Sequence, residues 1–192
     1  MKLNTLHNLY VQELRDLHAA EIQIQAALPT VIEAAGSPDL KDALRSHLAI
    51  TEGQIARLEN ILGTHGDTFP DSPCEGMRGL IAEVTALMDE EGDATIRDIG
   101  LIAGCRRIEH YEMAGYANVR KIAECLGCEE DALMLTATLE EESSTDDELT
   151  SVVTILLSQC DTIYRSGIAE DGTEDAEQGV SNGRNRAAAA VR

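Results

Sequence analysis

The residues best suited to chemistry are acids that interrupt apolar helical stripes. Glu109 and Glu112, in the run Glu109-His110-Tyr111-Glu112, lie inside a long apolar-periodic segment. Three other segments carry polar or acidic residues on their own stripes, namely Glu21, His47, and Glu142 with Asp146. Acidic side chains are rarely fully buried unless they are paired or hold a metal ion. The pattern therefore predicts a carboxylate-bridged metal site inside a helical bundle, with these six residues as candidate ligands.

A site for two iron or manganese ions needs hard oxygen ligands that bridge the cations, and imidazoles that complete their coordination. Glu109 and Glu112 lie one turn apart on one helical face, as a bridging and a terminal carboxylate would. Glu142 and Asp146 are also one turn apart, at positions where the stripe otherwise calls for Leu. The alternative is that these acids flank the apolar seam and pair with arginine. The nearby arginines are Arg57, Arg106 and Arg107.

The histidines leave two interpretations open. His47 lies on the stripe of its segment and is either a metal ligand or a hydrogen-bonded core histidine. His18 precedes Glu21 by three residues and is a further ligand candidate. His110 points about 100° away from Glu109 around the helix axis, so we expect it at an interface between helices.

The remaining metal-binding residue types form no recognisable motif. Cys125-Leu126-Gly127-Cys128 is a single Cys-x-x-Cys pair across a helix end, and a zinc site would need a second pair at the correct spacing. We favour incidental burial of these thiols over a redox role. His7 and His65 lie near segment ends, where we expect water to solvate them.

The apolar periodicity predicts an all-α fold. Apolar residues recur at three- and four-residue steps over 6–31 and again over 40–61. Between them, Gly36 ends the first helix, Ser37 is a suitable N-cap and Pro38 suits the next first turn. A loop over 63–73, a short helix over 75–91, and long helices over 94–126 and 129–166 follow. No stretch alternates as a β-strand would.

The order of these helices predicts a topology. Two long helices, a connection that contains a short helix, and two more long helices give two hairpins joined by a crossover, which is the ferritin-like four-helix bundle. We expect residues 1–166 to form this bundle. Residues 167–192 are rich in Gly, Asn, Asp, Glu and Arg, and we expect a disordered tail there.

The two hairpin turns test whether the acids can meet. Glu21 and Glu112 each lie about 15 residues before a turn, and Glu142 lies about 15 residues after one, at a rise of 1.5 Å per residue. The same count on the second helix reaches Ile50 and Thr51. All of these positions should lie at one level of the bundle, with apolar Ile50 as the fourth corner.

Composition excludes several classes of function. The net charge of −20 should repel nucleic acid and anionic membranes, and no apolar run reaches the length of a membrane span. Aromatic residues make up only 3% of the chain, which argues against base stacking. Five cysteines without a secretory signal indicate a reducing cytoplasm. The acidic, Lys-poor composition suits an ordinary cytosolic protein better than the alternative, a salt-adapted host.

Several of these motifs resemble the YciE/YciF-type ferritin-like family over residues 3–165, most specifically in the Glu-His-Tyr-Glu block. The matching elements are Asp16, Ala20-Glu21, His47 to Gln54 with Thr51, Arg97-Asp98, Glu109 to Glu112, and Leu139 to Glu142 with Asp146. The resemblance implies a homodimer linked to bacterial stress responses, with a rubrerythrin-like site for two metal ions. Two departures are Ala49-Ile50, where relatives carry an acid, and His18, where they commonly carry Tyr.

Two functional hypotheses follow. In the first, the protein is a stress-associated di-iron or di-manganese protein that carries out redox chemistry on peroxide or oxygen. In the second, it is a non-catalytic dimeric helical stress protein whose metal site is degenerate. Iron storage in a cage fits less well, because the resemblance is to a dimeric family.

Overall fold

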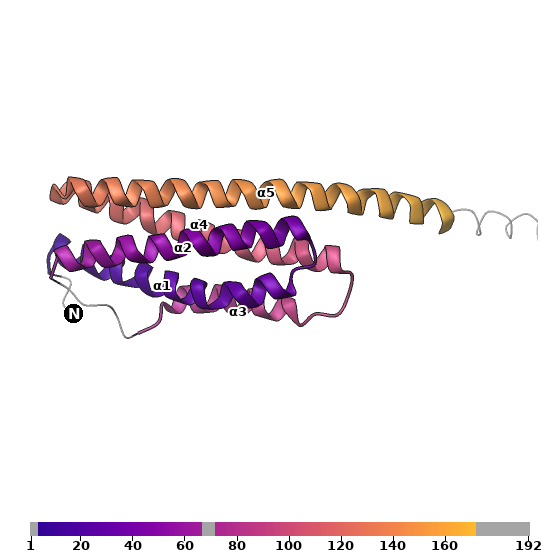
Figure 1. The fold of residues 1–192 in the computed structure, drawn as a ribbon, viewed down its shortest axis with the longest axis horizontal. Coiled ribbons are helices and arrows are strands. Elements are labelled where there is room, and N and C mark those ends of the chain that lie inside the picture. Colours follow the sequence, from indigo (N-terminus) through magenta and orange to yellow (C-terminus); the bar gives the residue numbers. More distant parts are fainter. Residues whose placement is uncertain (1–3, 67–71, 172–192) are drawn as a thin grey trace, which may run out of the picture. The chain divides into compact units, whose positions relative to one another are not determined.

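The chain is all-helical across residues 4–66 and 72–171, the part that this computed structural model describes. The helices are α1 (Leu6–Ala34), α2 (Pro38–Thr64), α3 (Glu75–Met88), α4 (Ala94–Leu126) and α5 (Glu129–Asp171) (Figure 1). The chain up to Thr154 forms one compact unit. A second unit begins at Ile155 and contains the last part of α5, which ends at Asp171. The predicted all-α bundle, with a short helix between two long hairpins, is confirmed.

Within the first unit, α1 packs against α2, α3 and α4. Before Thr154, α5 is joined to α2 by the ion pair of Arg57 with Glu141 and to α4 by that of Arg106 with Asp146. Two differences from the predicted boundaries are small. Helix α3 ends at Met88 rather than at residue 91, and α5 runs beyond residue 166 to Asp171. The rest of the predicted tail, 172–192, lies outside the described residues.

The hairpin turns form where the sequence predicts them. The Ser37 side chain caps α2, with Pro38 in the first turn. At the other turn Gly127 adopts φ 74°, a left-handed conformation that glycine tolerates best. The Cys128 N–H then donates to the Ala123 carbonyl at 3.0 Å, closing the end of α4.

A buried aspartate on α4 fixes the first hairpin. Asp98 is 2% exposed, and its two carboxylate oxygens accept hydrogen bonds from the backbone N–H groups of Gly36 (2.8 Å) and Ser37 (2.6 Å). Charge-assisted bonds of this kind are stronger than neutral ones. Asp98 thereby sets the height of the α1–α2 turn relative to α4, and with it the level at which Glu21 and Glu112 can meet.

The start of α3 is fixed in a similar way. The Gln23 amide both donates to the Cys74 carbonyl (3.3 Å) and accepts from the Cys74 N–H (2.7 Å). Close by, Asp16 accepts hydrogen bonds from the Tyr111 hydroxyl (3.1 Å) and the Cys74 thiol (3.3 Å). These contacts connect α1, the start of α3 and the face of α4 that carries Tyr111.

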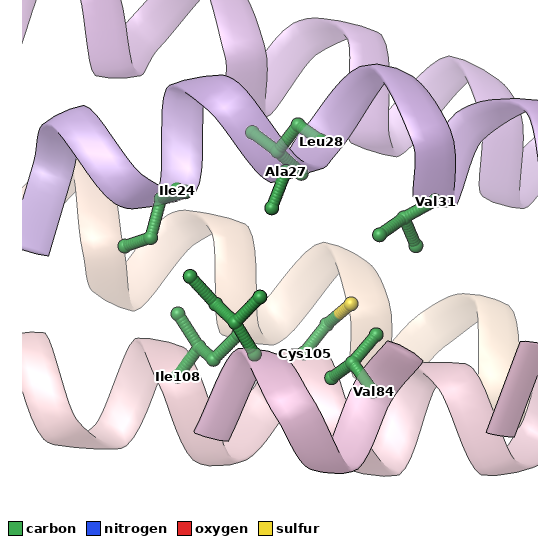
Figure 2. Close-up of a pocket in the computed structure, with 8 residues that line it drawn as sticks. Ile24, Ala27, Leu28, Val31, Val84, Cys105 and Ile108 are labelled. Atoms are coloured by element: carbon green, nitrogen blue, oxygen red, sulfur yellow. The ribbon is translucent and has the colours of Figure 1, made fainter. Parts of the chain in front are cut away.

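Apolar layers lie on both sides of the acidic level. Towards the α4–α5 turn the core contains Tyr10, Leu14, Leu17, Leu58, Ile61, Tyr116, Val119 and Leu135. Gly115 permits close packing there, since a Cβ atom at this position would lie 2.7 Å from Leu17 Cδ2. Towards the other end, Ile24, Leu28, Val84, Cys105 and Ile108 are among the residues that line a small apolar cavity of about 20 Å³ between α1, α3 and α4 (Figure 2). The acids between these layers are therefore shielded from water.

We predict that Asp98→Ala lowers the free energy of unfolding by about 1–3 kcal/mol, because two backbone N–H groups lose their only charged acceptor. Urea unfolding followed by circular dichroism measures the change. Glu90→Ala, at an exposed position, is the control and should stay within about 0.5 kcal/mol of wild type. An Asp98→Ala protein as stable as the control would show that the contact does not fix the turn.

Candidate metal centre

Four helices contribute to one buried polar cluster. Its members are between 0% and 3% exposed: Glu21 on α1, His47 on α2, Glu109 and Glu112 on α4, and Glu142 on α5. Ligand atoms of Glu21, Glu112 and Glu142 all lie within 4.8 Å of one another, and so do those of His47, Glu109 and Glu142. Glu142 belongs to both groups. The arrangement thus offers two adjacent sets of ligand atoms that share one carboxylate.

The level predicted from the turns is correct for three helices, since Glu21, Glu112 and Glu142 meet. On α2 the prediction is wrong for Ile50, whereas Thr51, which the same count reached, is buried. Ile50 is partly exposed, and the buried residues that α2 contributes are His47, Thr51 and Gln54. A count of residues gives the height of a side chain along the helix axis. It does not give the face of the helix on which the side chain lies, because the direction rotates by about 100° with each residue.

Several buried oxygens in the cluster have no conventional hydrogen-bond partner. Apart from neighbouring carboxyl groups, no partner among the described residues reaches either oxygen of Glu112, or one oxygen each of Glu21, Glu109 and Glu142. His47 Nδ1 and Thr51 Oγ1 are likewise unsatisfied. Native proteins leave few buried polar atoms unpaired, and a missing ion is one recognised reason. The donor set of carboxylates and one imidazole fits iron or manganese.

Two neutral side chains orient the carboxylates. Gln54 Nε2 donates to Glu142 Oε1, and the Tyr116 hydroxyl donates to Glu21 Oε1. His47 Nε2 lies 3.4 Å from Glu109 Oε1. Sequence reasoning assigned no site role to Gln54 or Tyr116, although spacing could have suggested one: Gln54 follows His47 by two helical turns, and Tyr116 follows Glu112 by one.

The electrostatics of the cluster are dominated by burial. Desolvation, followed by the charge of neighbouring glutamates, raises the pKa of Glu21, Glu109 and Glu112 well above the usual range. Burial also raises the pKa of Glu142 to about 7 and lowers that of His47 to about 4. The imidazole is therefore neutral at pH 7, with a lone pair free to bind a cation. A divalent cation would relieve the repulsion among the carboxylates.

The nearby arginines are engaged outside this cluster. Arg57 donates two hydrogen bonds to Glu141 (2.6 and 2.5 Å), which lies beside Glu142 but is partly exposed. Arg106 donates two to Asp146 (2.7 and 3.1 Å), and these bonds lower the pKa of that carboxyl. Asp146 is thus not brought into either ligand group within the described residues. The sequence left two roles open for these acids, metal binding and pairing with arginine. Asp146 takes the second role.

The other histidine candidates also lie apart from the two ligand groups. His18 is buried, with Nε2 3.5 Å from Glu59 Oε1. His110 on α4 lies 3.5 Å from Asp146 Oδ1 on α5, so it lies between two helices as expected, with a side chain that is 61% exposed. Neither belongs to a candidate metal-binding group among the residues that the structure describes.

Comparison with known proteins identifies the family of this chain. A family model described as "Domain of unknown function (DUF892)" matches residues 5–161. The chain belongs to this family. It is 33% identical over 153 residues to protein YciF of Escherichia coli strain K12, an alignment that covers 79% of this chain and 92% of YciF. The resemblance to YciE/YciF-type proteins is confirmed.

Solved structures of relatives share the fold. The crystal structure of the E. coli stress protein YciF matches with a TM-score of 0.79 and 32% identity, covering 81% of this chain and 99% of that chain. YcfI from Rhodopseudomonas palustris, named "a putative structural protein", matches with a TM-score of 0.75 and 36% identity over 78% of this chain and 95% of its own. Within the described residues, no helix is long and apolar enough to cross a membrane.

We predict that Glu112→Gln stabilises the metal-free protein at pH 8 by roughly 1–4 kcal/mol, because an amide removes a buried acid from among carboxylates. The folded-state pKa of Glu112 is raised above its ordinary value of 4.5. Above that pH the unfolded chain loses this proton more readily than the folded chain, so the native acid costs stability as pH rises. The advantage of Gln should therefore grow from pH 5 to pH 8.

Urea unfolding in the presence of a chelator measures this effect. The matched control is Glu141→Gln, which loses a charge-assisted pairing with Arg57 and should not stabilise the protein. A Glu112→Gln protein that is less stable than wild type at pH 8 would contradict the account of buried acid repulsion.

Proposed function

We propose that this protein is a stress-associated ferritin-like protein that holds two iron or manganese ions in its bundle and carries out redox chemistry on peroxide or oxygen. The observation that supports the proposal is the pair of buried ligand groups joined at Glu142, with carboxylate oxygens that lack other partners. By family resemblance we also expect a homodimer in the cytoplasm.

The residues divide into ligands and supports. Glu21, His47, Glu109, Glu112 and Glu142 would hold the ions, whereas Asp146, a candidate from sequence, is engaged by Arg106. When bound, two such ions supply Lewis acidity and electron transfer towards a peroxide or oxygen molecule.

The protein's own contribution is orientation, proton placement and exclusion of water. Gln54 donates to one oxygen of Glu142 and Tyr116 to one oxygen of Glu21, and the other oxygen of each carboxylate has no conventional hydrogen-bond partner. Burial raises the pKa of Tyr116 well above its usual value, so its hydroxyl keeps its proton and remains a donor. The apolar layers on both sides lower the local dielectric and strengthen every charge interaction within.

The alternative is a non-catalytic dimeric helical protein with a degenerate site. It draws support from the description of YcfI and from α2, which contributes His47, Thr51 and Gln54 but no carboxylate to the cluster. The two functions differ in metal content and in reactivity, and both can be measured on the full chain.

Metal analysis after anaerobic loading with Fe²⁺ or Mn²⁺ and desalting should give about two ions per chain. Glu112→Ala and Glu142→Ala should abolish this binding, because each removes a ligand, and Glu142 serves both groups. Glu91→Ala, at an exposed position, is the control and should load like wild type. Less than roughly 0.2 equivalents in wild type would refute the metal proposal.

The redox part has its own test. Iron-loaded wild type should consume hydrogen peroxide in a single-turnover experiment, and Glu142→Ala taken through the same loading should not. Wild type that binds two ions and leaves peroxide unchanged would favour the non-catalytic function.

A further inference from the structure

A second cluster of metal-binding side chains lies at the end of the bundle formed by the α4–α5 turn. His65 is the C-cap of α2, Cys128 follows the turn glycine, and Asp131 lies in the first turn of α5. One ligand atom from each of the three lies within 4.8 Å of the other two. Cys128 is about 24 Å along α4 from Glu112, at 1.5 Å per residue, so this cluster is separate from the central one.

The cluster is ordered by contacts on every member. Asp131 is buried, and its Oδ2 accepts a hydrogen bond from the buried Tyr10 hydroxyl (3.0 Å) and lies 2.8 Å from His65 Nε2. The backbone N–H of Cys128 is bound to the Ala123 carbonyl at 3.0 Å. The His65 side chain is 13% exposed, so the prediction that water solvates it is wrong.

The two ring nitrogens of His65 have different partners. Nε2 faces Asp131, whereas Nδ1 lies 3.1 Å from Nε2 of His7. In metal sites, a ligating histidine commonly engages a second group through its other nitrogen, which fixes the tautomer and the ring orientation. His7 is positioned to play this part for His65. Replacement of the proton between His65 and Asp131 by a cation would satisfy both side chains.

We propose that His65, Cys128 and Asp131 bind a transition metal ion of the zinc class, with a fourth position for water. One thiolate, one imidazole and one carboxylate form a donor set that suits Zn²⁺, and three protein ligands with one open position are a known zinc arrangement. A cysteine binds a metal ion as its thiolate, and the bound cation stabilises that thiolate. Such an ion would join the end of α2 to the start of α5.

This site also accounts for the single Cys-x-x-Cys pair. Its first member, Cys125, is exposed and belongs to none of the ligand groups among the described residues. The remaining ligands for Cys128 come from other segments rather than from a second Cys pair. The sequence therefore lacks the spacing of a zinc motif, although the folded chain brings three possible zinc ligands together.

The test is a titration of the reduced, metal-free full chain with Co²⁺, a spectroscopic substitute for Zn²⁺. We expect one equivalent to produce cobalt–thiolate charge-transfer absorption in the near ultraviolet, and stoichiometric Zn²⁺ to remove it. The central cluster has no cysteine among its ligand groups, so this band reports the second site. It should persist in Glu112→Gln, which makes the result independent of the proposed function.

Variants assign the band to residues. Cys128→Ser should abolish it, and Cys125→Ser, the matched control one helical turn away, should retain it. His65→Ala should lose it, while His7→Ala should weaken binding by roughly 10–100-fold, the usual effect of removing an outer partner. Circular dichroism confirms that each variant is folded. Absence of the band in wild type, or its persistence in Cys128→Ser, would overturn the proposal.

Discussion

The structure depends on one electrostatic constraint, the burial of four glutamates at one level of a helical bundle. Desolvation of a carboxylate is costly, and neighbouring carboxylates add repulsion. Glu21, Glu109, Glu112 and Glu142 are each 1% exposed or less, and within the described residues none of them forms an ion pair with arginine or lysine. The rest of the bundle must therefore hold these groups together against the cost of desolvation and their mutual repulsion.

That task is divided between the ends and the layers of the bundle. Asp98 fixes the first turn, and the left-handed Gly127 closes the second, so the helices cannot slide to separate the acids. Leu17 and Ile24 lie one turn on either side of Glu21 and pack into apolar surroundings. Tyr116 and Gln54 then satisfy one oxygen each of Glu21 and Glu142. The fixed turns keep the glutamates close together, and the apolar layers exclude water from them. Both effects shift the pKa values of the cluster.

Much of this could be predicted from the sequence because helices follow simple periodicities. The apolar stripes, Ser37-Pro38 and Gly127 located the helices and turns, and the rise per residue placed Glu21, Glu112 and Glu142 together. Rotation about each helix axis was harder, since Ile50 and Thr51 share a height but not a face. Asp146 shares the face of Glu142, yet Arg106 engages it, and only the spatial positions of both side chains show this. His65 and Asp131 are distant in sequence, so no local motif could reveal their contact.

The membership of Glu142 in both ligand groups has a thermodynamic consequence. Two cations that shared this carboxylate would not bind independently, because each would alter the charge and orientation of a ligand that the other uses. By linkage, whatever factor the first ion imposes on the affinity of the second must apply equally in reverse. The centre would then fill as a cooperative or anticooperative pair, and the shared side chain of Glu142 on α5 would contribute to that coupling.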